Sequence, residues 1–177
     1  EVHYVDAEIG RLLDTLRAKG LLEKPLVVVV ADHGESLGEH RCWFEHGRDA
    51  YETTCRVPLI VRLPASKGAR PAPGVRNADL SLADIAPTIL DWLGLPKLRD
   101  AMGSKNRLGA DDPAVHPVFA EKVDRTERSG AVQMKAVRIG DWKLIRRYAQ
   151  RLEKDVPAEK RVVVLSEELY DLARDPG

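Results

Sequence analysis

The residues best suited to chemistry follow one apolar segment near the amino end of the chain. Residues 26–31 are a continuous apolar run, mostly valine, and Asp32, His33 and Glu35 come directly after it. An apolar run of this length without polar alternation is typical of a strand buried on both faces of a parallel sheet. Open α/β sheets bind their ligands at the carboxyl ends of such strands. Asp32 and His33 therefore stand where a bound group is expected.

The donor types at this position suit a divalent cation. A carboxylate beside an imidazole offers a hard oxygen and a borderline nitrogen, a pair that can hold a cation which in turn holds an anionic substrate. An isolated Asp-His pair is more often structural, the aspartate capping a turn and the histidine hydrogen-bonded in a loop. Here Gly34 and Gly38 permit tight turns, and further candidate side chains follow: Glu35, Glu39, His40 and His46. We predict a metal site, with the structural roles as the alternative.

Three stretches in and around this segment form a recognisable set: Ala-Asp-His-Gly-Glu-Ser-Leu-Gly-Glu-His at 31–40, Phe-Glu-His-Gly at 44–47 and Tyr-Glu-Thr-Thr-Cys-Arg-Val-Pro-Leu-Ile-Val at 51–61. Together they resemble the sulfatase family of the alkaline-phosphatase superfamily. The resemblance continues in order along nearly the whole chain, through residues 2–16, 81–95, 136–145 and 168–177. It implies an enzyme that hydrolyses sulfate esters with the help of a divalent metal ion.

The resemblance also implies roles for individual residues. Asp32 and His33 match the second pair of metal ligands in sulfatases, where the ion is usually calcium and sometimes magnesium or manganese. His46 matches a catalytic basic residue that contacts the sulfate group near its bridging oxygen. Arg56 matches an arginine that pairs within the fold beneath the site. His40 recurs in the motif, and we assign it no role.

The nucleophile of the family is missing from this sequence. Sulfatases use a formylglycine made within a Cys-x-Pro-x-Arg or Ser-x-Pro-x-Arg motif, beside a first pair of metal-binding aspartates. Cys55 begins Cys-Arg-Val-Pro-Leu, with the proline one place late and leucine in place of arginine, and Cys42 precedes Trp-Phe-Glu. We therefore expect a carboxyl-terminal part of a sulfatase, with the formylglycine in a preceding part. A phosphonate or phosphate ester hydrolase of the same superfamily and a non-catalytic fragment are the alternatives.

Composition narrows the class of partner. The 177 residues carry 28 basic and 28 acidic side chains, and this balance argues against a dedicated nucleic-acid surface. The partner implied by the sulfatase resemblance is a small-molecule or carbohydrate sulfate ester. No apolar run approaches the roughly 20 residues of a membrane span. Two cysteines are too few for a disulfide framework and could pair or stay reduced. The oligomeric state and the compartment, whether periplasmic, secreted or cytoplasmic, stay open.

The elements that position the candidate site follow an α/β order. Residues 1–20 predict an amphipathic helix with one apolar face buried in the core and Gly20 as its carboxyl cap. One or two helical turns are predicted over 49–54, and Pro58 indicates either an edge position or the entry to a strand over 57–63. Residues 81–93 predict a second helix, with a capping box of Ser81 and Asp84. We predict an α/β fold containing part of a doubly wound, mixed or parallel sheet flanked by helices.

The carboxyl-terminal half changes to short strands. They are predicted at 118–122, 135–139, 143–147, 161–165 and 168–172, with Gly140-Asp141 as a hairpin turn, in a small antiparallel sheet packed against a helix. We expect residues 1–96 to belong to the α/β catalytic domain and 97–177 to be a connecting segment and a small antiparallel subdomain. Several charged residues could approach the substrate but are more simply solvated: Lys67, Arg70, Arg76, Glu121, Lys122, Arg125 and Arg128.

Overall fold

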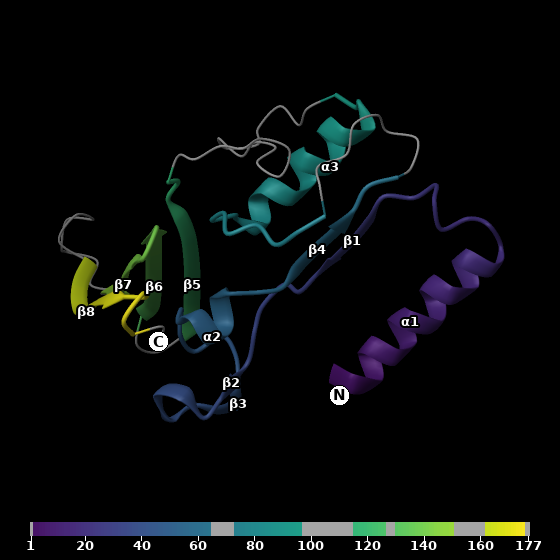
Figure 1. Cartoon of the computed structure of the whole chain (residues 1–177). Helices are drawn as coiled ribbons and strands as arrows, with labels where there is room; N and C mark the ends of the chain where they lie inside the picture. The colour runs from purple at the N-terminus through teal and green to yellow at the C-terminus, as the bar shows by residue number, and fades with distance from the viewer. Residues whose placement is uncertain (1, 65–72, 97–114, 127–129, 151–161, 176–177) are drawn as a thin grey trace. The chain divides into compact units, whose positions relative to one another are not determined.

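The computed structural model describes residues 2–64, 73–96, 115–126, 130–150 and 162–175. Helices and sheets are mixed, as the predicted α/β class requires (Figure 1). In chain order the elements are α1 (Val2–Ala18), β1 (Val27–Val30), β2 (Ser36–Leu37), η1 (Glu39–Arg41), β3 (Trp43–Glu45), α2 (Glu52–Cys55), β4 (Leu59–Arg62), η2 (Leu82–Asp84), α3 (Ile85–Leu93), β5 (Val118–Thr126), β6 (Gly130–Ile139), β7 (Trp142–Gln150) and β8 (Val162–Asp171).

The chain forms two compact units. One contains residues 1–31 and 58–75, and the other contains residues 32–57 and 76–177. The predicted boundary between residues 96 and 97 stays a prediction, since the segment 97–114 lies outside the described residues. None of the described helices is long and apolar enough to cross a membrane.

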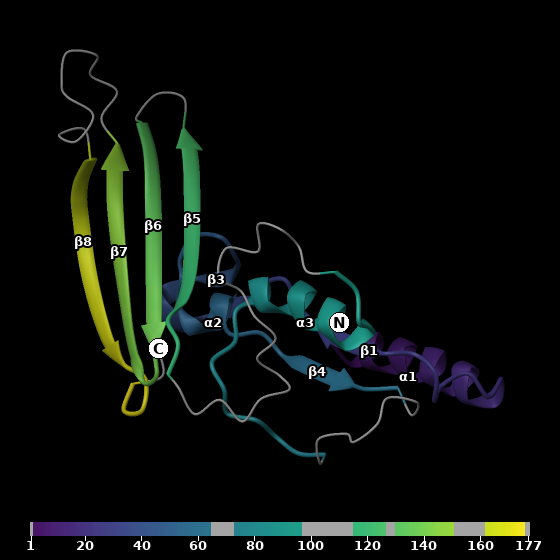
Figure 2. The same ribbon diagram turned by 90° about the horizontal axis from the view of Figure 1, so that it is seen from above.

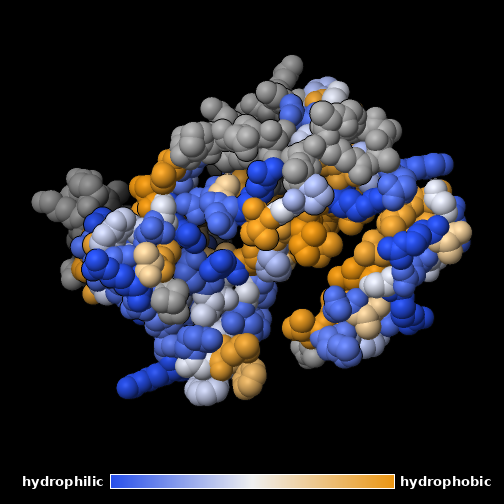
Figure 3. Space-filling view, in the orientation of Figure 1, coloured by the Kyte–Doolittle hydropathy of each residue, from blue (hydrophilic) through white to orange (hydrophobic). Residues whose placement is uncertain are grey.

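Helix α1 belongs to the first unit and ends where the sequence predicts. Gly20 adopts a φ of 65°, and the Leu21 amide donates to the Leu16 carbonyl at 2.9 Å, so a left-handed glycine closes the helix. The prediction of a buried face is wrong for the described residues, because no residue of α1 is buried and Val2 is 85% exposed. Figure 3 shows apolar side chains at the surface of this helix. An amphipathic pattern predicts which face of a helix is apolar, and it does not show which residues pack on that face.

Strand β1 pairs with β4 in antiparallel register, from Val27 opposite Arg62 to Val30 opposite Leu59. Within the described residues β1 has no parallel partner, and Val30 is 39% exposed, so the predicted burial on both faces is not found. A two-stranded ribbon has too little apolar surface to cover its own faces. Pro58 immediately precedes β4, as predicted, and removes no donor from the ladder.

The second unit contains a four-stranded antiparallel sheet in the order β5-β6-β7-β8 (Figure 2). Gly140 and Asp141 join β6 to β7 as predicted, with Gly140 at a φ of 58°. The two segments predicted at 161–165 and 168–172 are one strand, β8. The register shifts between Arg147 and Tyr148, leaving Leu165 as an extra residue on β8. The same register sets Arg138 of β6 directly opposite Lys143 of β7.

The core of the second unit lies between this sheet and the segment around α2. Ala50 packs with Met134, Ala136 and Ile145, each at most 4% exposed. Partly buried residues surround this cluster: Tyr51, Cys55, Ala120 and Tyr170. The predicted packing of a helix against the sheet is thus made by the short helix α2 and the residues before it.

The predicted second helix starts with a 3-10 turn, η2, and continues as α3. The capping box is confirmed, since Ser81 Oγ accepts from the Ala83 amide at 3.2 Å and the Asp84 carboxylate accepts from the Ser81 amide at 3.1 Å. Asp84 and Thr88 are buried, and Thr88 Oγ1 donates to the Asp84 carbonyl at 2.6 Å, which fits structural roles. Gly94 ends the helix at a φ of 70°.

Truncation of Met134 tests the position of this core. Met134→Ala should lower the free energy of unfolding by about 2–5 kcal/mol, because it empties a site packed against Ala50 and Ile145. Leu169→Ala is the control, since Leu169 lies on β8 of the same sheet and is 65% exposed. Chemical denaturation should show a change within about 0.5 kcal/mol for the control. Equal losses in the two variants would contradict this core.

Candidate active site

Asp32 and His33 lie in the second unit, in the loop that follows β1 in the chain. The Asp32 side chain is 91% exposed, and its Oδ1 accepts a hydrogen bond from the His33 amide at 3.0 Å. His33 Nδ1 lies 2.9 Å from the Gly34 carbonyl oxygen. Since a carbonyl only accepts, Nδ1 carries a proton in this contact. In the neutral ring, Nε2 then keeps a free lone pair, at 3.8 Å from Asp32 Oδ1.

His46 joins the same group of side chains. Its ring stacks on the ring of His33, with centroids 4.3 Å apart and planes inclined by 20°. Its Nδ1 lies 3.2 and 3.3 Å from the two carboxylate oxygens of Glu35. The short hairpin of β2 and β3 explains the meeting, because Ser36 pairs with Glu45 and so brings Glu35 and His46 to the same end of the ladder. Asp32, His33, Glu35 and His46 form what we call the loop cluster.

The donors in the loop cluster fit two ligands of one metal ion. Ligand atoms at about 2.0–2.6 Å from a common ion lie roughly 3–4 Å from each other, and Asp32 Oδ1 and His33 Nε2 are separated by 3.8 Å. Among the described residues, no three His, Cys, Asp or Glu side chains are arranged as a complete site. The pair can therefore contribute to a metal centre whose other ligands come from elsewhere.

The backbone of this loop is held against α2. The Gly34 amide donates to the Thr54 carbonyl at 2.9 Å, and a Cβ at position 34 would overlap the Thr53 carbonyl oxygen. Ser36 is fully buried, and its Oγ lies 3.1 Å from Thr53 Oγ1. Residue 34 must therefore be glycine because of a close backbone approach, since only a residue without a Cβ fits.

Comparison with known proteins identifies the family. The family model described as Sulfatase matches residues 1–95, more than half of the chain. The chain belongs to the sulfatase family. A choline-sulfatase of Rhizobium meliloti (strain 1021) is 28% identical over 183 residues, which cover 99% of this chain and 30% of that protein. An N-acetylglucosamine-6-O-sulfatase of Bacteroides thetaiotaomicron is 40% identical over 101 residues, or 56% of this chain and 17% of that protein.

Solved structures support the fold of this sulfatase chain. The yidJ protein of Bacteroides fragilis superposes with a TM-score of 0.64 at 19% identity, covering 99% of this chain and 35% of that one. Ps i-CgsB, solved with k-i-k-neocarrahexaose, gives a TM-score of 0.60 at 17% identity, covering 99% and 36%. The sulfatase chain thus spans about a third of the length of the proteins that match nearly all of it.

His40 of the sulfatase chain contacts a different group. Its ring stacks on Tyr51, with centroids 3.6 Å apart, and meets the edge of Tyr170 at 6.4 Å. Both tyrosine hydroxyls donate to Glu168 Oε2, at 2.7 and 2.6 Å. Burial, followed by the hydrogen bonds with Glu168, raises the pKa of Tyr170, while the Tyr170 hydroxyl is the main cause that lowers the pKa of Glu168. His40 thus belongs to a polar aromatic contact between η1, the segment before α2, and β8.

Arg56 and the two cysteines do not have the features of catalytic residues in the described structure. Arg56 is exposed and forms no salt bridge within the described part of the chain, so the expected pairing beneath the site is not found. Cys42 and Cys55 are free thiols. Burial raises the pKa of both, the opposite of what activates a nucleophilic thiol.

Three of the charged residues considered for substrate contact have side chains that the structure describes: Arg76, Glu121 and Lys122. Glu121 forms an ion pair with Lys135 at 3.5 Å, and Arg76 and Lys122 have partners of their own. The side chains of Lys67, Arg70, Arg125 and Arg128 lie outside the described residues.

Sequence reasoning gave no role to Glu35 in orienting His46, and it missed the hairpin that brings them together. Strand β2 has only two residues, and three non-glycine residues nearby adopt positive φ, at His40, Arg41 and Phe44. Such residues rarely adopt this conformation, so their types do not signal the turn. The one usable signal in the sequence was that Glu35 and His46 flank the short segment 36–45, whose two ends would meet if it formed a hairpin.

Substitution of Gly34 tests the close approach to α2. Gly34→Ala should destabilise the protein by about 1–3 kcal/mol or more, because the added methyl overlaps the Thr53 carbonyl. The control is Gly10→Ala in α1, where a Cβ meets nothing within 4 Å and should be neutral or stabilising by up to about 1 kcal/mol. Thermal unfolding of both variants gives the comparison, and a neutral Gly34→Ala would contradict the described loop.

Proposed function

We propose that this chain supplies part of the active site of an enzyme that hydrolyses sulfate esters. The observation that carries the proposal is the loop cluster of a sulfatase-family chain, in which Asp32 contacts His33, His33 stacks on His46, and His46 contacts Glu35. Because the chain spans about 30% of the choline-sulfatase it resembles, the activity is proposed for the intact protein. The formylglycine nucleophile and the first pair of metal-binding aspartates would come from residues outside this chain.

Asp32 and His33 would hold a divalent cation, most simply calcium, with magnesium or manganese as alternatives. The separation of their donor atoms supports binding of one ion, as does the free lone pair of His33 Nε2. When bound, the ion supplies Lewis-acid neutralisation of the sulfate oxygens and fixes the orientation of the ester. Because the Asp32 carboxylate is exposed, it could bind an ion together with ligands from outside this chain.

His46 would stabilise negative charge on the leaving oxygen. Glu35 accepts at Nδ1, which orients the ring and leaves Nε2 directed away from the carboxylate. With Nδ1 donating to Glu35, the ring can also donate from Nε2 when it is an imidazolium, and this hydrogen bond would reach the bridging oxygen as the sulfur–oxygen bond breaks. Glu35 acts here as a positioning residue, since it acts through the imidazole.

The substrate class follows from the named relatives. One is a choline-sulfatase, others are arylsulfatase K from several vertebrates, and one is an N-acetylglucosamine-6-O-sulfatase. We propose a small-molecule or carbohydrate sulfate ester as the substrate.

The first test removes the proposed carboxylate ligand. Asp32→Ala in the intact protein should lower metal affinity and turnover by more than the roughly 10–100-fold typical of an outer-sphere residue, because a direct ligand is lost. Metal content by elemental analysis and sulfate release by ion chromatography check this prediction. Asp14→Ala, which changes an exposed aspartate of α1, is the matched control.

Unchanged metal content and turnover in Asp32→Ala would overturn the assignment. Relative rates on an aryl sulfate and an aryl phosphodiester test the reaction class in the same assay. A clear preference for the phosphodiester would replace sulfate ester hydrolysis by phosphoryl transfer.

The second test separates His46 from the metal pair. His46→Ala should lower kcat by about 10²–10⁴-fold on an alkyl sulfate. The loss should be much smaller on 4-nitrophenyl sulfate, because a stable phenolate needs little help to leave. Steady-state kinetics on both esters, with metal content measured in parallel, check the prediction. Equal losses on the two substrates would contradict a role at the leaving oxygen.

A further inference from the structure

The loop cluster depends on contacts made by its backbone. The Asp32 side chain is almost fully exposed, and its hydrogen bond and ion pair are both with His33, its neighbour in the chain. Two contacts tie residues 32–36 to α2: the Gly34 amide donates to the Thr54 carbonyl, and the Ser36 hydroxyl lies against Thr53 Oγ1. These two contacts are the anchors of the loop on α2. The order of the metal-binding pair is therefore limited by the order of α2.

Helix α2 is too short to be stable alone. It has four residues, Glu52–Cys55, whereas isolated helices of fewer than about 12 residues are marginal in water. Local contacts help, since Asp49 Oδ1 accepts from Thr54 Oγ1 at 2.8 Å and from the Tyr51 amide at 3.3 Å. The remaining support must come from the sheet on which it packs.

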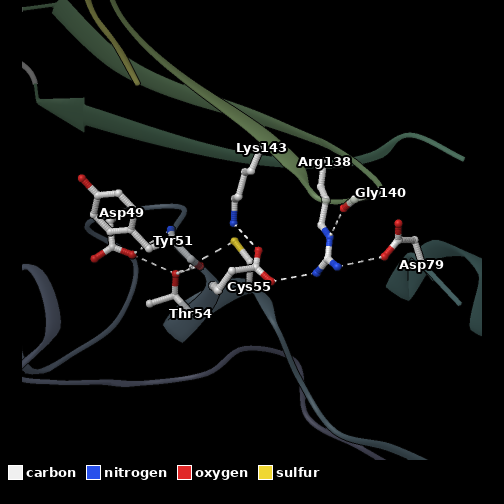
Figure 4. A network of polar contacts seen from close by, with 9 residues as sticks. Asp49, Tyr51, Thr54, Cys55, Asp79, Arg138, Gly140 and Lys143 are labelled. Carbon is white, nitrogen blue, oxygen red and sulfur yellow. Dashed lines mark hydrogen bonds and ion pairs between the residues drawn. The ribbon is translucent and has the colours of Figure 1, made fainter. Parts of the chain in front are cut away.

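Glu52 provides a charged link between α2 and that sheet. Its Oε1 accepts from Lys143 Nζ at 2.7 Å and its Oε2 accepts from Arg138 Nη1 at 2.9 Å. Arg138 also reaches Asp79 at 3.3 Å and the Gly140 carbonyl at 3.0 Å (Figure 4). The Lys143 side chain is only 4% exposed and that of Glu52 13%. We name Glu52, Asp79, Arg138 and Lys143 the Glu52 ion cluster.

Because the Glu52 ion cluster is largely buried, its charges are compensated only while the four side chains keep their positions. The two carboxylates and two cations balance in charge. Because the Lys143 side chain is almost fully buried, water cannot readily replace the Glu52 carboxylate as its partner. Removal of one partner leaves an uncompensated buried charge, which forces a rearrangement of the groups around it. A displacement of Glu52 moves α2, and α2 carries both anchors of the loop.

We propose that the Glu52 ion cluster is a positioning device for the loop cluster, with Glu52 and Lys143 as positioning residues for the metal-binding pair. The β6–β7 hairpin fixes the position of Glu52 and so of α2. Helix α2 in turn holds the backbone at Gly34 and Ser36, and this backbone sets the positions of Asp32 and His33. The proposal rests on the proposed function for its catalytic consequence, while its structural consequence can be measured independently.

The experiment compares Glu52→Gln, Lys143→Met and the double variant in the intact protein. Amide hydrogen exchange of residues 32–38 is read by mass spectrometry, and metal dissociation constant, kcat and KM for a sulfate ester are measured in parallel. Each single variant should increase exchange in this loop and weaken metal binding by about 10–100-fold. The effect should fall mainly on kcat, and the neutral double variant should recover part of the loss.

Lys135→Met is the matched control, because Lys135 lies on β6 of the same sheet and its ion pair with Glu121 is about half exposed. It should leave exchange of residues 32–38 and the kinetics unchanged. If Lys143→Met fails to fold, Glu52→Gln, which keeps the shape of the side chain, decides the question.

The outcomes separate the two proposals. Lower global stability with unchanged loop exchange and metal affinity in Glu52→Gln would overturn the positioning role. A wild-type protein that does not release sulfate would overturn the proposed function, and loop exchange would still decide whether the cluster positions residues 32–38.

Discussion

The structure of the site depends on a close approach between two backbones. Gly34 lies so near the Thr53 carbonyl that no side chain fits, and its amide donates to Thr54. This contact fixes where the chain turns after β1, and so fixes the directions in which Asp32 and His33 leave the backbone. Ser36 of β2 is fully buried, with its hydroxyl against Thr53 of α2, and it starts the hairpin that returns His46 to Glu35. Loss of this approach would leave the loop cluster held by the β2–β3 hairpin and its own side-chain contacts, without its link to α2.

Features set by neighbouring residues could be predicted from the sequence. The capping box of Ser81 and Asp84, the glycine ends of two helices and the Gly140-Asp141 turn all depend on local backbone chemistry. Asp32 and His33 could likewise be expected to lie close together, because they are consecutive residues. The resemblance to sulfatases added His46, which spacing alone would not have linked to them.

Features set by distant residues could not be predicted in the same way. Glu52 and Lys143 are 91 positions apart, and neither residue type nor local pattern indicates that they meet. The short hairpin of β2 and β3 was missed because its turn uses residues that seldom adopt positive φ. The burial of β1 and α1 was overestimated, since a pattern shows that a face is apolar and leaves open what covers it.

The register of the β6–β7 hairpin has a consequence for how this unit folds. Arg138 and Lys143 are directly opposite on adjacent strands, an arrangement of like charges that destabilises an isolated hairpin. The carboxylate of Glu52 bridges the two cations, so docking of α2 relieves the repulsion between them. Helix α2, being a single turn, in turn depends on this contact with the hairpin. Docking of α2 and closure of the β6–β7 turn should therefore stabilise each other during folding.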